Sequence, residues 1–122
     1  LSRALAPSAA CPACLLEQDA EHRAAKILLN HIDDQAIADA YRKAGGLCLP
    51  HLQITIAHAS QSAVKELVAW QAEVWSQLRG ELDELIRKHD YRFQSEPVTE
   101  AESIAWERAV AAVAGEPEPD AE

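Results

Sequence analysis

The fold is decided by residues 50–89, which read PHLQITIAHASQSAVKELVAWQAEVWSQLRGELDELIRKH. Apolar residues recur along this stretch in steps of three and four, the spacing at which side chains share one face of an α-helix. The stripe consists of Leu52, Ile56, Ala59, Ala63, Leu67, Trp70, Val74, Leu78, Leu82 and Leu85, and it ends at His89. The pattern predicts one long helix or two collinear helices from Pro50 onward. Gly80 is the expected position of a bend, since glycine costs about 1 kcal/mol inside a helix.

Two helices are predicted before this stretch. The first covers about residues 13–30, where apolar side chains again follow helical spacing. The second is capped by Asp33 or Asp34, whose carboxylate can accept hydrogen bonds from the first turn, and it runs to Ala44. The Gly45–Gly46 pair ends it, because glycine takes the left-handed conformation that closes a helix.

One more helix is predicted after residue 98. Thr99 and Glu102 have the spacing of a capping box, in which each side chain bonds the backbone of the other residue. The helix then runs to Ala114 and stops at Gly115. We therefore predict an all-α fold, a small helical bundle with one long central helix.

The composition limits the classes of function. Of the 122 residues, 48% are hydrophobic and only 5% are aromatic, and the formal net charge is −9. A chain of this charge repels a phosphate backbone on average, which argues against nucleic-acid binding. The sequence contains no run of about 18 apolar residues, so no membrane span is predicted.

The three cysteines of the chain lie in two short motifs, CPAC at residues 11–14 and CLPH at residues 48–51. Each motif places two metal ligands three residues apart, and together they supply three thiolates and one imidazole, a tetrahedral set typical of zinc. Both motifs lie at predicted helix starts, where the helix dipole favours a thiolate. We therefore predict a structural zinc ion bound by Cys11, Cys14, Cys48 and His51, which joins the N-terminal ends of two helices.

Two alternatives remain open for the same residues. An iron–sulfur cluster also accepts three thiolates and one histidine, and ligand type alone does not separate it from zinc. A CxxC motif can also be a redox-active dithiol, although such motifs usually accompany strands. The alternative function is therefore an iron–sulfur or thiol-based redox sensor. In each case metal-bound or free thiolates suit a reducing compartment, and a cytoplasmic location is expected.

A closed zinc site argues against an enzyme, because four protein ligands leave no coordination position for water or substrate. His58 lies two turns after His51 on the predicted helix and is a candidate hydrogen-bond partner for it. The acidic residues Glu17, Asp19 and Glu21 lie near a helix start, where the dipole explains them without any further role.

Three motifs together resemble those of a bacterial family of unknown function. They are CPAC at residues 11–14, GGLCLPHL at residues 45–52 and KHDYRF at residues 88–93, with a tryptophan following at Trp106. Members of that family are similar in carrying CPxC, GLCxxH-type and KHDYRF-type segments, and the resemblance covers most of the chain from Cys11 to Gly115. It implies the same metal ligands, namely Cys11, Cys14, Cys48 and His51, and it brings no established activity.

The KHDYRF segment also gathers positive charge in an acidic chain. Arg87, Lys88 and Arg92 lie beside Tyr91 and Phe93. The favoured interpretation is that the cations complement a helix C-terminus while the aromatic residues fold the turn back onto the core. The alternative is a contact with an anion or an acidic partner.

The chain is thus expected to have three parts. Residues 1–10 form an N-terminal arm, residues 11–115 a helical metal-binding domain, and residues 116–122 a disordered acidic tail. We expect the domain to act through contacts with a protein partner, and its long helix is a candidate surface for pairing with a second copy in a homodimer.

Overall fold

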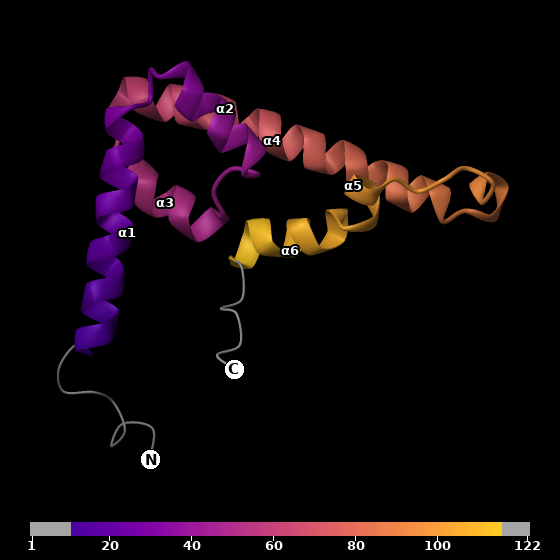
Figure 1. Ribbon diagram of the computed structural model, residues 1–122, viewed down its shortest axis with the longest axis horizontal. Coiled ribbons are helices and arrows are strands. Elements are labelled where there is room, and N and C mark those ends of the chain that lie inside the picture. The colour runs from indigo at the N-terminus through magenta and orange to yellow at the C-terminus, as the bar shows by residue number, and fades with distance from the viewer. Residues whose placement is uncertain (1–10, 116–122) are drawn as a thin grey trace, which may run out of the picture.

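The computed structural model describes residues 11–115, and helices are the regular structure in this part of the chain. They are α1 (Pro12–Asn30), α2 (Gln35–Lys43), α3 (Leu49–Ala57), α4 (Gln61–Lys88), α5 (Glu100–Ser103) and α6 (Ala105–Ala114), with a 3₁₀ turn η1 at Tyr91–Phe93 (Figure 1). The all-α prediction and the long central helix, α4, are confirmed. The predicted arm at residues 1–10 and the predicted tail at residues 116–122 lie outside the described residues.

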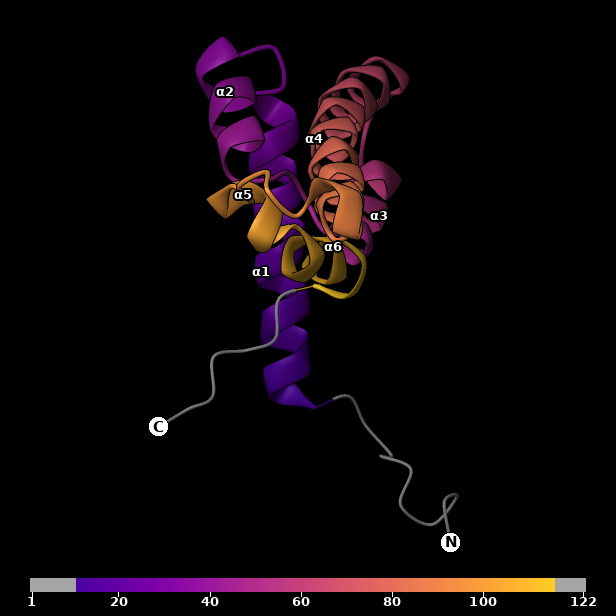
Figure 2. The ribbon, with the colours of Figure 1, turned by 90° about the vertical axis from the view of Figure 1, so that its right-hand side faces the viewer.

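The helices are arranged around α4, which is the longest. In Figure 1, α2 lies along the first half of α4, while α5 and α6 lie along its later part. The chain returns through α6 so that the end of α6 comes close to the beginning of α3. α1 crosses this assembly and packs against α3 with its second half, and its first half extends beyond the other helices in both Figure 1 and Figure 2. None of the helices between residues 11 and 115 combines the length and the apolar character needed to cross a membrane.

The prediction of one helix, or two collinear ones, across residues 50–89 is wrong in one respect. The helix ends at Ala57, and the chain changes direction before α4 begins at Gln61 (Figure 1). Ser60 caps α4, because its hydroxyl accepts a hydrogen bond from the backbone N–H of Ala63 at 3.3 Å. The apolar spacing continues across the break because both helices bury their stripes in the same core. α4 itself continues without interruption through Gly80.

The hydrophobic core lies where α2, α3 and α4 meet. Its buried members are Ile32, Ala38, Tyr41, Leu52, Ala63, Leu67, Trp70 and Val74. Leu67 of α4 is fully buried, and Trp70 packs its ring against the ring of Tyr41 at 5.6 Å between centroids. Burial of such aromatic and aliphatic side chains is the main favourable term in the stability of a domain of this size.

A buried polar cluster attaches the loop between α2 and α3 to this core. Gln71 of α4 is only 2% exposed, and its side-chain oxygen accepts hydrogen bonds from the Tyr41 hydroxyl and from the backbone N–H of Leu47, the latter at 3.0 Å. Burial raises the pKa of Tyr41 to about 12. Gly46 passes over the Gln71 amide with φ of 75°, and a Cβ at this position would lie 2.9 Å from the amide atoms. The loop that leads into α3 is therefore held in one path.

The far end of α4 is fastened to α5. Lys88 donates to both carboxylate oxygens of Glu102 at 2.8 and 2.7 Å and to the carbonyl of Pro97 at 2.9 Å. The predicted capping box is confirmed, since the Thr99 hydroxyl accepts from the Glu102 N–H and the Glu102 carboxylate accepts from the Thr99 N–H. Glu102 thus serves the helix cap and the ion pair at once.

Candidate metal-binding residues

Cys48 and His51 lie together at the beginning of α3. Cys48 is the N-cap residue and Pro50 occupies the first turn, so the backbone turns into the helix between the two ligands. The Cys48 Sγ lies 3.1 Å from the Nδ1 of His51. The Leu47 hydrogen bond to Gln71 fixes the residue immediately before Cys48. The structure therefore brings one of the two predicted ligand pairs into direct contact.

The other side of the His51 ring faces an acidic residue of α1. The Nε2 of His51 lies 3.4 Å from the Oε1 of Glu21, so the imidazole is placed between a thiol and a carboxylate. A carboxylate in this position orients a metal-binding histidine and fixes its tautomer. The sequence indicates no such role for Glu21, because nothing in it shows that the middle of α1 packs on the beginning of α3.

His58 is not the hydrogen-bond partner of His51 that the sequence suggested. It forms the C-cap of α3, and its ring packs edge-on against the ring of His22 with 4.8 Å between the centroids. The partner of His51 is Glu21 instead. The prediction assumed that the helix continued past residue 57, whereas α3 ends there.

Cys11 and Cys14 lie at the beginning of α1. Cys11 is the N-cap and Pro12 follows in the first turn. The Cys11 side chain makes no close capping hydrogen bond, yet the backbone N–H groups of Cys14 and Ala13 and the Cys14 thiol favour its thiolate and lower the pKa of Cys11. Both thiols are exposed, as is every residue from 11 to 20. This pair is accessible to a metal ion, an oxidant or a partner.

The structure does not bring the two pairs together. Among residues 11–115, no group of three or more histidine, cysteine, aspartate or glutamate side chains is placed to hold a metal ion. The residue of α1 that reaches His51 is Glu21, and Cys14 precedes Glu21 by seven residues, which is roughly 10 Å along a helix. In Figures 1 and 2 the first turn of α1 lies at its far end, away from the beginning of α3. Within residues 11–115 of one copy, the structure therefore places the two predicted ligand pairs apart.

A hollow opens beside the Cys48–His51 pair. It lies between the middle of α1, the beginning of α3 and the end of α6, and its wall includes Glu21, Cys48, His51, Ala111 and Gly115. Gly115, the residue after α6, lies so close to Cys48 that a Cβ at position 115 would be 3.8 Å from the Cys48 sulfur. The pair thus borders an open space that is large enough to admit further side chains.

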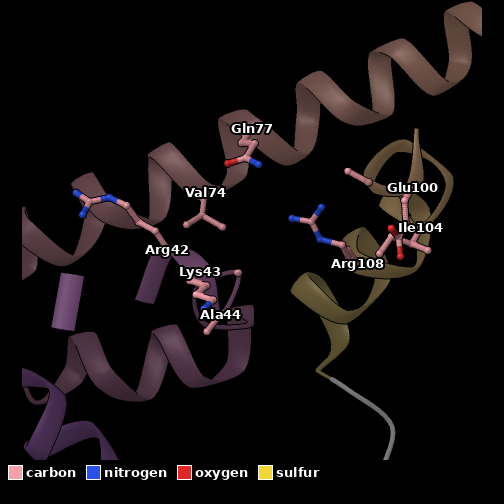
Figure 3. Close-up of a pocket in the computed structure, with 10 residues that line it drawn as sticks. Arg42, Lys43, Ala44, Val74, Gln77, Glu100, Ile104 and Arg108 are labelled. Atoms are coloured by element: carbon pink, nitrogen blue, oxygen red, sulfur yellow. The ribbon is translucent and has the colours of Figure 1, made fainter. Parts of the chain in front are cut away.

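A second cavity, shown in Figure 3, lies between the end of α2, the middle of α4 and the α5–α6 region. Arg42, Lys43 and Arg108 contribute positive charge to its wall. Arg42 is bound to Glu73 at 2.6 Å, and Arg108 is bound to Glu81. Both guanidinium groups already have carboxylate partners, and Glu100 in the same wall offsets the charge of Lys43, so this cavity offers little net charge for an anion.

The basic residues of the KHDYRF region also have acidic partners. Arg87 pairs with Glu84 and Glu96, Lys88 with Glu102, and Arg92 with Asp90. The guanidinium groups of Arg87 and Arg92 both lie over the ring of Phe93, at 4.8 and 5.6 Å from its centroid. These contacts support the part of the interpretation in which cations close the end of α4. The prediction that the aromatic residues fold back onto the core is wrong for Tyr91, which is 80% exposed.

Comparison with known proteins identifies the family of this chain. No curated protein and no solved structure matches this chain. A family model described as "Family of unknown function (DUF6062)" matches residues 31–120, a stretch that contains Cys48, His51 and the KHDYRF segment and that begins after Cys11 and Cys14. Since the match covers more than half of the sequence, the chain belongs to DUF6062, a family of unknown function.

Proposed function

We propose that this chain is a small helical zinc-binding module that acts through protein–protein contacts, with zinc in a structural role. The observation that carries the proposal is the 3.1 Å contact between Cys48 Sγ and His51 Nδ1 at the beginning of α3. A cysteine sulfur and a histidine nitrogen bound to one tetrahedral zinc lie about 3.5 Å apart, given the usual bond lengths. Only a small adjustment of the two side chains is needed to admit the ion between them.

The surroundings of the pair support the same proposal. Binding through Nδ1 leaves Nε2–H free to donate to Glu21, at 3.4 Å from it, and this arrangement of carboxylate, imidazole and metal is typical of zinc sites. The chain has only two other cysteines, Cys11 and Cys14, so these are the candidates for the remaining ligands. Their exposure and the lowered pKa of Cys11 suit thiolates that are free to bind a cation.

Exposed apolar residues support a role in protein contacts. Trp106, Val110 and Val113 of α6 are between 56% and 64% exposed and share one face of the helix, since they are spaced by four and three residues. A contiguous apolar face of this kind is typical of a surface that another protein covers. A module stiffened by zinc would present such a face in a fixed orientation.

Zinc titration of the full chain, purified under reducing conditions, tests the proposal. We expect one zinc per chain with an apparent dissociation constant below about 0.1 µM, the range of structural sites at neutral pH. Cys48→Ser and His51→Ala should each weaken binding by more than about 100-fold, because even the outer partners of ligands contribute about 10–100-fold. His58→Ala is the matched control, since His58 caps the end of the same helix and its ring lies against His22. Binding that is unaffected by Cys48→Ser would overturn the proposal, and a brown protein with visible absorbance would assign the ligands to an iron–sulfur cluster instead.

A thiol-based redox role is the second candidate, and it rests on Cys11 and Cys14. Both thiols are exposed, and the neighbouring N–H groups of Cys14 and Ala13 lower the pKa of Cys11, which favours its reactive thiolate form. Oxidation would join the two sulfurs in a disulfide and transfer two electrons and two protons to a disulfide such as oxidised glutathione, which is reduced to two thiols. Equilibration with glutathione buffers, read as a mass decrease of about two hydrogens in a Cys48→Ser background, measures the potential. A potential outside the range of cellular thiol buffers would remove this candidate.

A further inference from the structure

We propose that the zinc site is completed between two copies of this chain, so that Cys11 and Cys14 of one copy bind the same ion as Cys48 and His51 of the other. This inference rests on the proposed zinc binding and specifies its partner, a second copy of the same chain. Its starting point is that residues 11–115 of one copy form no group of three metal-ligating side chains.

The geometry of α1 separates the two pairs within one copy. α1 is a continuous helix from Pro12 to Asn30, and its middle is fixed against α3 where Glu21 meets His51. Cys14 lies on the same face as Glu21, because seven residues make nearly two turns, but it is displaced by roughly 10 Å along the axis. Ligands of one zinc must come within about 4 Å of each other, as bonds of about 2.3 Å require. With α1 intact, the CxxC pair therefore points to the side of the helix where α3 lies without reaching Cys48.

The exposed first half of α1 has the features of a segment that packs against another molecule. Every residue from 11 to 20 is exposed, and this part of α1 projects beyond the other helices in Figures 1 and 2. Leu15 and Leu16, next to Cys14, are 51% and 69% exposed. A projecting half-helix with no packed face has little stability of its own in water. A second copy that packs against this half-helix would give it one.

The receiving side is present on the same chain. The Cys48–His51 pair borders the hollow between α1, α3 and the end of α6, where a helix start from another molecule can approach. A two-fold arrangement satisfies both copies at once. If two α1 helices pack antiparallel about an axis between Glu17 and Gln18, midway between Cys14 and Glu21, each Cys14 becomes level with the Glu21 and His51 of the other copy. Two equivalent sites of three thiolates and one imidazole result.

Mixing two complementary variants of the full chain tests this arrangement. The first is Cys11→Ser with Cys14→Ser, which keeps only the Cys48–His51 pair. The second is Cys48→Ser with His51→Ala, which keeps only the CxxC pair. All four side chains lie at exposed or partly exposed positions, so both variants should keep the helicity of the wild type, as far-UV circular dichroism checks. Zinc is titrated against a chromophoric chelator, and size-exclusion chromatography with light scattering gives the mass.

If the site is shared, neither variant alone binds zinc tightly, whereas an equimolar mixture does. The mixture should bind half as much zinc per chain as the wild type, since each mixed dimer keeps one complete site, and it should elute at the mass of a dimer. Zinc should also convert the wild type from monomer to dimer.

Three other results would overturn the inference, and they differ in what they leave standing. A wild type that binds zinc as a monomer, together with a mixture no better than its parts, places all four ligands in one copy and leaves the proposed function intact. Tight zinc binding by one double variant alone shows that a single pair suffices. A wild type that binds no more zinc than either double variant removes the proposed function as well.

Discussion

The carboxylate of Glu21 on α1 lies 3.4 Å from the Nε2 of His51 on α3, while the Nδ1 of the same ring lies 3.1 Å from the sulfur of Cys48. One imidazole thereby connects the helix that carries the CxxC motif to the helix that carries the second ligand pair. The contact fixes which part of α1 is level with the site, and it determines that Cys11 and Cys14 lie beyond it.

Replacing Glu21 should weaken zinc binding without changing the ligands. We expect Glu21→Ala to lower zinc affinity about 10–100-fold, because His51 loses the group that orients its ring. Asp19→Ala is the control, since Asp19 is exposed, lies two residues before Glu21 and therefore faces away from His51 around the helix. Competition with a chelator at fixed pH measures both variants. Equal zinc affinities for the two variants would show that Glu21 contributes no more to zinc binding than an exposed carboxylate does.

The Tyr41 hydroxyl should contribute to the stability of the whole fold. Its removal in Tyr41→Phe takes one of two donors from the buried Gln71 oxygen and should lower the free energy of unfolding by about 1–2 kcal/mol. The matched change Tyr91→Phe should have no measurable effect, because Tyr91 is 80% exposed. Urea unfolding followed by circular dichroism gives both values. A Tyr41→Phe protein as stable as Tyr91→Phe would contradict the role assigned to the buried cluster.

Two glycines should respond in opposite directions to the same substitution. Gly46→Ala should destabilise the protein by more than about 1 kcal/mol, because φ is 75° and the new Cβ would lie 2.9 Å from the enclosed Gln71 amide. Gly80→Ala should stabilise it by about 0.5–1 kcal/mol, since Gly80 lies inside α4 with no atom within 4 Å of the added Cβ. Thermal and urea unfolding of the pair measure the contrast. A stabilising Gly46→Ala would mean that the loop before Cys48 is not held in this path.

Glu102 should make the stability depend on pH in the acid range. Its hydrogen bond from Lys88, followed by that from the Thr99 backbone, lowers the pKa of Glu102 below its ordinary value of 4.5. As the pH is lowered, the unfolded state therefore takes up a proton at Glu102 before the folded state does. The stabilisation by this carboxylate is present above about pH 4.5 and is lost as the pH falls through the lowered pKa of the folded state. Urea midpoints should fall less between about pH 5 and pH 2 for Glu102→Gln than for wild type. Glu107→Gln, at an exposed position on α6, should keep the wild-type slope.

Local sequence signals predicted the ends of several helices. Asp34 caps α2 by accepting from the Ala36 N–H at 2.9 Å, and the Thr99–Glu102 capping box begins α5. Gly45 and Gly46 both have positive φ after α2, as the prediction for a helix end requires. These features involve residues a few positions apart, so the sequence contains all the interacting groups.

The break between α3 and α4 could not be predicted from the residues of this segment alone. The apolar steps from Ile56 to Ala59 and Ala63 keep helical spacing, and they do so because both helices contribute to one core. Ser60 is the cap that marks the break, but serine also occurs within helices and signals an end only when the chain turns. The role of Glu21 was hidden for a related reason, because its contact with His51 joins residues thirty positions apart. Such pairs are fixed by helix packing rather than by local pattern.

Cys48 directly follows Leu47, whose backbone N–H is hydrogen-bonded to Gln71, the most buried polar side chain of α4. A displacement of the Cys48 sulfur, caused by a bound ion or by oxidation, therefore reaches the buried hydrogen bonds through one residue, with no flexible surface loop between them. Chemistry at the thiol should consequently register as a change in how the entire molecule melts, and calorimetry alone would then suffice to detect an occupant.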